Sequence, residues 1–216
     1  MFNKDNSITC AGSVFVIHDE QAILLMFRWT VGNTEGIEEF DFYNMTLTFP
    51  GGGTVSEFYY NSFQVVWNNG MRDTFLAAKN SFPTYELWVT GVSMGASMAA
   101  LAAPYISQMG YFAPKDIKMV NYGELRVGHK DFADRYPSLV PYAYRIVHRN
   151  DIMPHIIPLE AGYVHHQNEI WYNNLMHETD PWVECDAEES QNCSDSVPKS
   201  EWTKLDHVYF EHTCNC

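Results

Sequence analysis

Positive charge is scarce in this sequence: 13 Lys and Arg residues stand against 27 Asp and Glu residues, for a formal net charge of -14. Such a surface repels a phosphate backbone, so we exclude nucleic acid as a partner. Charged residues make up only 19% of the chain and hydrophobic residues 46%, a balance that excludes disorder. A chain of 216 residues can bury roughly 70% of its unfolded surface. We therefore expect a single domain over residues 1–216.

Long hydrophobic runs are also missing. No charge occurs between Glu86 and Lys115, but Pro104 and several small or polar residues interrupt the apolar stretch 94–113. This composition favours a helix inside a protein core, so we expect no transmembrane segment. The N-terminus has no apolar core of a signal peptide, and no repeat or low-complexity tract is visible.

The chain has five cysteines, of which four crowd near the C-terminus and Cys10 stands alone near the start. An extracellular disulfide set with one partner missing fits this pattern, and Cys185 with Cys193 is the pairing we expect first. Zinc-type CxxC pairs and an HExxH motif are absent from the sequence, so we predict no metal site. Two Asn-x-Ser/Thr triplets, at Asn44 and Asn192, agree with secretion.

Hydrophobic patterning predicts an α/β protein. An N-terminal strand hairpin is expected at 13–18 and 22–27, then a strand at 45–49 and a long amphipathic helix over 55–82, with Gly70 as a possible break. Strands and helices then alternate, which predicts a mostly parallel sheet covered on both faces. The expected elements are strands 85–90, 117–122 and 142–148, helices 94–109 and 128–136, and a short hairpin at 162–172.

The strongest chemical signal is a Gly-x-Ser-x-Gly sequence at Gly91, Ser93 and Gly95, between a predicted strand and a predicted helix. This context is typical of the nucleophile elbow of serine hydrolases, where the tight turn leaves no room for side chains at the glycines. The alternative is a glycine-rich turn in which Ser93 only caps the helix. The catalytic interpretation is favoured because the helix N-terminus can stabilise developing negative charge.

A serine nucleophile needs a base and an orienting acid, which follow in the order Ser, Asp, His in folds of this type. Asp151 follows a predicted strand, where catalytic groups of open α/β sheets collect. On order alone, either His207 or His212 can be the base. The remaining pairs, His165-His166 and His177-Glu178, are interpreted as surface or hairpin residues.

The chain resembles the class 3 lipases, the fungal-type triacylglycerol lipase family, and especially its nematode branch. The resemblance extends over nearly the whole length and implies an α/β-hydrolase fold. Six ordered segments carry it: residues 25–30, 89–101, 122–128, 145–158, 162–172 and 206–210.

Carried over to this sequence, the resemblance implies Ser93 as nucleophile, His207 as the base and Asp151 as the group that orients the imidazole. The oxyanion donors are then the backbone amides of Met94 and Thr30. No metal or organic cofactor is required by this chemistry.

The resemblance also implies a substrate-binding region and a lid. Trp29, Val92 and Ile152 are expected beside the substrate, and residues 31–43 are expected to form the lid, although their acidic run also suits a solvated loop. Trp29 departs from the family, which has a glycine before the oxyanion threonine, and an indole there can obstruct the acyl site. The segment before Cys10 is also shorter than in the family, which indicates either a truncated sequence of a secreted enzyme or a shortened relative.

We therefore expect a secreted serine carboxylic-ester hydrolase of the lipase type, acting on triacylglycerol or a related lipid ester, with transient contact to a lipid interface. The alternative is a catalytically impaired lipase-like protein that binds lipid or a partner, which the fold alone does not exclude. A phospholipid or a feruloyl ester is a further candidate substrate for the same triad.

Overall fold

A seven-stranded sheet forms the centre of the computed structural model, which describes residues 9–30, 43–210 and 212–213. Its strand order is β1-β2-β5-β6-β8-β10-β11. The strands are β1 (Thr9–Ile17), β2 (Ala22–Thr30), β5 (Glu86–Val92), β6 (Ile117–Tyr122), β8 (Tyr142–His148), β10 (Glu169–Tyr172) and β11 (Val183–Cys185).

The sheet is parallel in its centre and antiparallel at both edges. Strands β2, β5, β6, β8 and β10 run parallel, whereas β1 pairs with β2 and β11 with β10 in the antiparallel sense. The predicted N-terminal hairpin and the mostly parallel sheet are thus confirmed. All parallel strands end at one edge of the sheet, which is where a site is expected in such folds.

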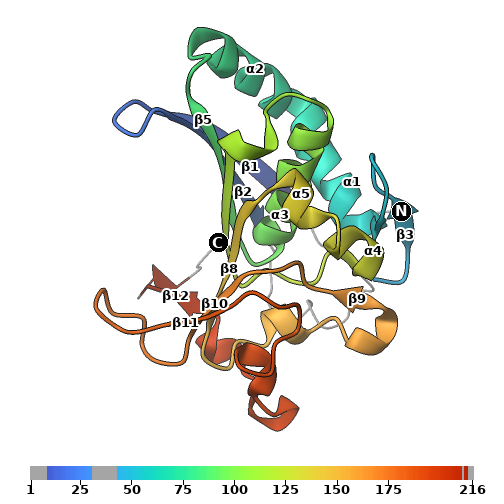
Figure 1. Ribbon diagram of the computed structural model, residues 1–216, viewed down its shortest axis with the longest axis vertical. Coiled ribbons are helices and arrows are strands. Elements are labelled where there is room, and N and C mark those ends of the chain that lie inside the picture. Colours follow the sequence, from blue (N-terminus) through green and yellow to red (C-terminus); the bar gives the residue numbers. More distant parts are fainter. Residues whose placement is uncertain (1–8, 31–42, 211, 214–216) are drawn as a thin grey trace.

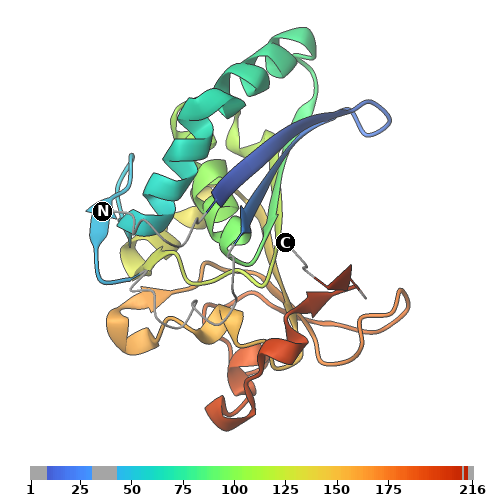
Figure 2. The same ribbon diagram turned by 180° about the vertical axis from the view of Figure 1, so that it is seen from behind.

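Three helices, α1 (Glu57–Val66), α2 (Arg72–Ser81) and α3 (Met94–Gln108), lie together on one side of the sheet (Figures 1 and 2). Buried and half-buried side chains alternate along β5 and β6, as expected when one face of each strand is covered more fully than the other. Within the described part of the chain, the long helices pack against this face alone. We expected helices on both faces of the sheet; in the described residues, the long helices cover one face.

The helix expected over 55–82 is divided in two. Val55 belongs to a strand, β4 (Thr54–Ser56), and α1 and α2 are separated by a π-helical turn, η2 (Trp67–Met71). Gly70 in this turn has φ 120° and ψ -22°, values that L-residues rarely adopt. The break suggested by Gly70 is therefore confirmed, and the single continuous helix is wrong.

A smaller sheet of order β3-β4-β7-β9 corrects two further predictions. The helix expected at 128–136 is replaced by a short strand and two single-turn helices. The hairpin expected at 162–172 does not form, because β9 pairs with β7 while β10 pairs with β8 in the central sheet. The elements are β3 (Thr46–Thr48), β7 (Gly128–His129), β9 (Tyr163–Val164), α4 (Lys130–Ala133) and α5 (Tyr136–Leu139).

The C-terminal region consists mainly of turns that are held by a disulfide and by buried polar contacts. Cys185 and Cys193 form the disulfide that the sequence favoured. The last strands are β12 (Val208–Tyr209) and β13 (His212–Thr213). The 3-10 turns of the chain are Pro114–Asp116, Met153–His155, Leu159–Ala161, Ser194–Ser196, Lys199–Glu201 and Lys204–Asp206. None of the helices described here is long and apolar enough to cross a lipid bilayer.

Candidate active site

Ser93 occupies a sharp turn between the end of β5 and the start of α3. Its backbone angles are φ 56° and ψ -128°, a strained conformation for a residue with a side chain. The Ser93 amide donates a hydrogen bond of 2.8 Å to the carbonyl oxygen of Tyr122, the last residue of the neighbouring strand β6. The turn is thus attached to the carboxyl ends of two parallel strands.

The two glycines of the turn are required by close packing. A Cβ atom at Gly91 would lie 2.4 Å from the carbonyl carbon of Gly95, and one at Gly95 would lie 2.3 Å from the carbonyl oxygen of Phe27 in β2. Neither backbone can yield without moving α3 away from the sheet. The glycine pattern predicted from the sequence therefore has a direct steric cause.

Asp151 and His207 come together although 56 residues separate them. The Nδ1 atom of His207 lies 2.8 Å from Oδ2 of Asp151, within hydrogen-bond distance. The same carboxylate accepts a bond of 2.6 Å from the Tyr209 hydroxyl, and its Oδ1 accepts one of 2.9 Å from the amide of Met153. Asp151 is completely buried. Three hydrogen-bond donors thus compensate the free-energy cost of burying this carboxylate, and they fix its orientation.

His207 and Ser93 lie against two consecutive residues, Gly123 and Tyr122. A Cβ atom at Gly123 would lie 2.6 Å from Cε1 of the His207 ring, and Gly123 follows Tyr122, whose carbonyl holds the Ser93 amide. Among the described residues, the buried Nε2 atom of His207 has no hydrogen-bond partner. The ring therefore presents one nitrogen to Asp151, and its other nitrogen forms no hydrogen bond with the described residues.

Of the remaining predicted residues, two adjoin Ser93 in the chain and one adjoins Asp151. Met94 is the buried first residue of α3, Val92 is the half-buried last residue of β5, and Ile152 follows Asp151. Trp29 and Thr30 end β2, but their side chains lie outside the described part of the chain. The same is true of residues 31–42, which cover nearly all of the expected lid, and of the His212 side chain.

Two histidines contradict the sequence-based interpretation. His165 and His166 were expected on the surface or in a hairpin, yet they are 2% and 3% exposed. His165 Nε2 bonds to the carbonyl oxygen of Pro154 at 2.9 Å, and the His166 ring stacks on Tyr136 at 4.0 Å. Both are core residues, because segments distant in the sequence cover them.

Sequence reasoning also missed two features of the site region. Tyr209 belongs to the resembling segment 206–210, to which only His207 contributes a predicted role, yet its hydroxyl donates a hydrogen bond to Asp151. Arg126 was matched only as part of a motif, whereas its guanidinium binds the carboxylate of Glu189 at 2.9 and 2.5 Å. No local signal identifies Glu189, because it lies in the polar tail of the sequence.

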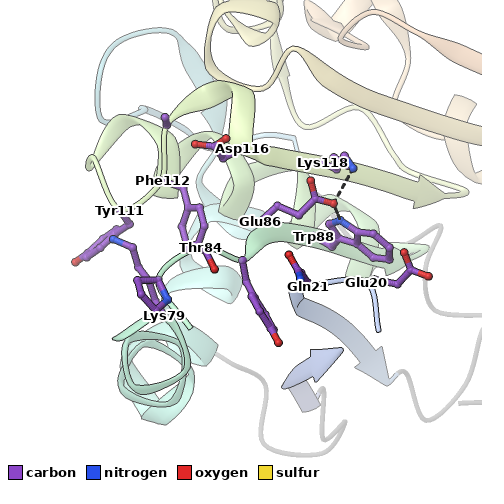
Figure 3. A pocket seen from close by; sticks show the side chains of 13 residues that line it. Glu20, Gln21, Lys79, Thr84, Glu86, Trp88, Tyr111, Phe112, Asp116 and Lys118 are labelled. Atoms are coloured by element: carbon purple, nitrogen blue, oxygen red, sulfur yellow. Dashed lines mark hydrogen bonds and ion pairs between the residues drawn. The ribbon is translucent and has the colours of Figure 1, made fainter. Parts of the chain in front are cut away.

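A pocket of about 820 Å³ lies at the other end of the sheet, beside the amino ends of β5 and β6 (Figure 3). Glu86 accepts hydrogen bonds there from Lys118 at 2.6 Å and from the Trp88 indole at 2.5 Å. Since Ser93 and His207 follow or adjoin the carboxyl ends of these strands, this pocket is separate from the candidate active site.

A mostly parallel sheet with a strained serine turn between strand and helix defines the α/β-hydrolase fold. Solved structures of the same fold agree. Lipase II from Rhizopus niveus is similar to this chain with a TM-score of 0.84 and 27% identity, over 96% of this chain and 81% of that chain. The lipase from Rhizopus microsporus var. chinensis has a TM-score of 0.83 and 26% identity, over 93% of this chain and 69% of that chain.

Sequence comparison then gives the family. The pattern of the family Lipase (class 3) matches residues 24–161, which is more than half of the chain, so the chain belongs to the class 3 lipases. A lipase from Caenorhabditis elegans is 30% identical over 215 residues, covering 87% of this chain and 60% of that protein. Secreted mono- and diacylglycerol lipase 1 from Fusarium solani is 30% identical over 149 residues, covering 69% of this chain and 43% of that protein. The chain thus spans about half the length of these relatives.

Proposed function

We propose that this chain hydrolyses carboxylic esters of lipids through an acyl-enzyme on Ser93. The observation that carries the proposal is the Asp151–His207 pair, whose second imidazole nitrogen is buried and has no partner among the described residues, and whose ring adjoins Gly123, the residue after the one that holds the Ser93 amide. Family membership supports the same chemistry.

In the first half of the reaction, Ser93 Oγ attacks the ester carbonyl carbon while His207 Nε2 accepts the hydroxyl proton. The bond to the leaving alcohol then breaks, and the imidazolium returns its proton to that oxygen. Water, deprotonated by the same nitrogen, next attacks the acyl-enzyme, and the fatty acid leaves as Ser93 regains its proton. Asp151 holds the Nδ1–H of His207 and stabilises the imidazolium, without accepting the proton itself.

The negative charge on the substrate oxygen is stabilised by backbone amides. Met94 starts α3, where the first amides have no partner within the helix and the helix dipole favours an anion. The Thr30 amide at the end of β2 is the second proposed donor. Removing one such donor typically costs about 10² to 10³ in rate. Trp29, Val92 and Ile152 are proposed to contact the acyl group.

The substrate and location are proposed from the relatives. Mono-, di- or triacylglycerol is the proposed substrate class, and brief contact with a lipid interface delivers it. Secreted relatives and the Cys185–Cys193 disulfide support an extracellular location.

The test is hydrolysis of short-chain and long-chain p-nitrophenyl esters by the purified chain, with Ser93→Ala as the matched variant. We expect turnover that falls by at least about 10³-fold in Ser93→Ala, because the residual rate comes from the oxyanion donors and binding alone. Equal rates for the two proteins would refute a Ser93 mechanism. A folded wild-type chain that binds lipid without any turnover would favour the impaired-lipase alternative.

A further inference from the structure

A set of buried ionisable side chains, which the proposed reaction does not use, includes His155, four residues after Asp151. Each is at most 14% exposed, and together they connect three separate segments of the chain. We name it the Arg126 cluster; its members are Arg126, His155, Glu189 and Asp195.

Arg126 is the centre of the cluster. Its Nε and Nη2 atoms donate hydrogen bonds of 2.9 and 2.5 Å to the two carboxylate oxygens of Glu189, and its Nη1 donates one of 2.7 Å to the carbonyl oxygen of Ile157. Burial alone raises the pKa of the Glu189 carboxyl group, but the hydrogen bond from Arg126 and the positive charge of Arg126 outweigh this effect, so the pKa lies well below its usual value. The pair is therefore ionised, and its geometry is fixed by a bidentate contact.

The cluster holds the segment that follows Asp151. Arg126 binds the carbonyl of Ile157, and the His155 Nδ1 atom lies 3.2 Å from Oδ1 of Asp195. The His155 ring also stacks on Trp202 at 4.8 Å. Residues 151–157 contain one 3-10 turn, at Met153–His155, and Asp151 forms an isolated β-bridge with Thr203. The bridge holds the start of this segment, and the side-chain contacts of the cluster hold its later part, at His155 and Ile157.

The disulfide holds the other side of the cluster. Glu189 lies inside the loop closed by Cys185 and Cys193, and Asp195 follows that loop by two residues. Glu189 also has φ 48°, a conformation that an L-residue keeps only when its surroundings enforce it. The closed loop thus presents the Glu189 carboxylate to Arg126, and the turn directly after the loop presents that of Asp195.

We propose that Arg126 is a positioning residue for the Asp151–His207 pair, and that the disulfide-closed loop, through Glu189, keeps Arg126 in place. This inference rests on the proposed function. A displacement of about 1 Å in a catalytic group can cost about 10²-fold in rate, so contacts remote from the substrate can control turnover. The KM value should not change, because none of these contacts involves the substrate.

The experiment compares three isosteric variants. Glu189→Gln weakens the hold on Arg126. Glu188→Gln changes the preceding loop residue, which faces the exposed Lys130, and Glu169→Gln changes a second buried pair, with Arg145 on β8. We expect kcat to fall at least about tenfold in Glu189→Gln at constant KM, and to stay within about twofold in the two controls.

Two further measurements distinguish positioning from general destabilisation. The double variant Cys185→Ser/Cys193→Ser should lower kcat to a similar extent, and adding Glu189→Gln to it should cause little further loss, because both act through Arg126. The ¹H resonance of the His207 Nδ1–H should shift in Glu189→Gln and stay in place in the controls. This signal needs no ester hydrolysis, so it tests the inference even if the proposed reaction fails.

The inference is overturned if kcat and the His207 resonance are unchanged in Glu189→Gln, or if Glu169→Gln lowers kcat as much as Glu189→Gln does. Should Glu189→Gln not fold, Asp195→Asn offers the same comparison through His155, with the same controls. An unchanged kcat and an unchanged resonance in that variant would overturn the proposal equally.

Discussion

Gly123 shows how one missing side chain makes room for the candidate base. It has φ 58°, and a Cβ atom there would lie 2.6 Å from Cε1 of His207 and 3.0 Å from the Tyr209 hydroxyl. Gly123→Ala should therefore displace the imidazole and lower kcat by about 10²-fold, in addition to a loss of stability of about 1–2 kcal/mol. Steady-state kinetics and urea unfolding of the purified variant measure the two effects.

Gly110 provides the matched control for this prediction. It also has a positive φ, 70°, but a Cβ atom there would have no neighbour within 4 Å. Gly110→Ala should lose a similar amount of stability and keep its kcat. If both variants lose activity in proportion to their stability, the contact with His207 is not the cause.

At the scale of elements, the turn between α1 and α2 decides whether replacing Gly70 by alanine stabilises or destabilises the chain. A glycine inside a regular helix costs about 1 kcal/mol relative to alanine, so a continuous helix over 55–82 predicts that Gly70→Ala stabilises the chain. The observed φ of 120° at Gly70 predicts the opposite, a loss of about 1–3 kcal/mol, although the position has open space. The free energy of unfolding decides, and a gain in stability would contradict the break described here.

The central sheet and the Ser93 turn show what can be predicted from the sequence. Strands β6 and β8 have the predicted bounds, because each is a short segment rich in β-branched, aromatic and other apolar residues. The Ser93 turn was predictable for a similar reason, since its glycines lie within two residues of the serine. Elements that depend on residues close together in the sequence can therefore be predicted from it.

Pairings between distant segments were not predictable from the pattern. Residues 163–164 and 169–172 resemble the two strands of a hairpin, yet they join different sheets, because their partners β7 and β8 come earlier in the chain. The Arg126–Glu189 contact joins residues 63 positions apart in the same way. Burial of His165 and His166 follows from such long-range packing, which periodicity does not report.

At the scale of the whole molecule, His165 predicts how stability depends on pH. Burial, and then the charge of Arg145, hold the pKa of His165 well below its usual value. In the described residues its Nδ1 atom is buried and has no hydrogen-bond partner, so a proton there would bring an unpaired charge into the core. The folded protein therefore contains neutral His165 at neutral pH.

The direction in which stability changes with pH depends on whether the folded or the unfolded chain binds more protons. Unfolded His165 takes up a proton near pH 6.5, whereas the folded form does so only at lower pH, so the unfolded chain binds more protons between the two values. Its contribution to stability is complete above about pH 6.5 and decreases as the pH falls below it, by up to about 1.4 kcal/mol per pH unit. Urea unfolding at pH 7.5 and pH 5.5 measures this slope.

Other groups titrate as well, and acidification also reduces a net charge of -14, which lessens repulsion across the molecule. The comparison must therefore be between wild type and His165→Gln, whose amide can still donate to the Pro154 carbonyl that His165 contacts. His177→Gln, at an exposed position, is the control. We expect wild type and His177→Gln to lose stability more steeply than His165→Gln between pH 7.5 and 5.5. Identical slopes in all three proteins would show that the unfolded and folded chains bind equal numbers of protons at His165, and would contradict its burial as a neutral imidazole.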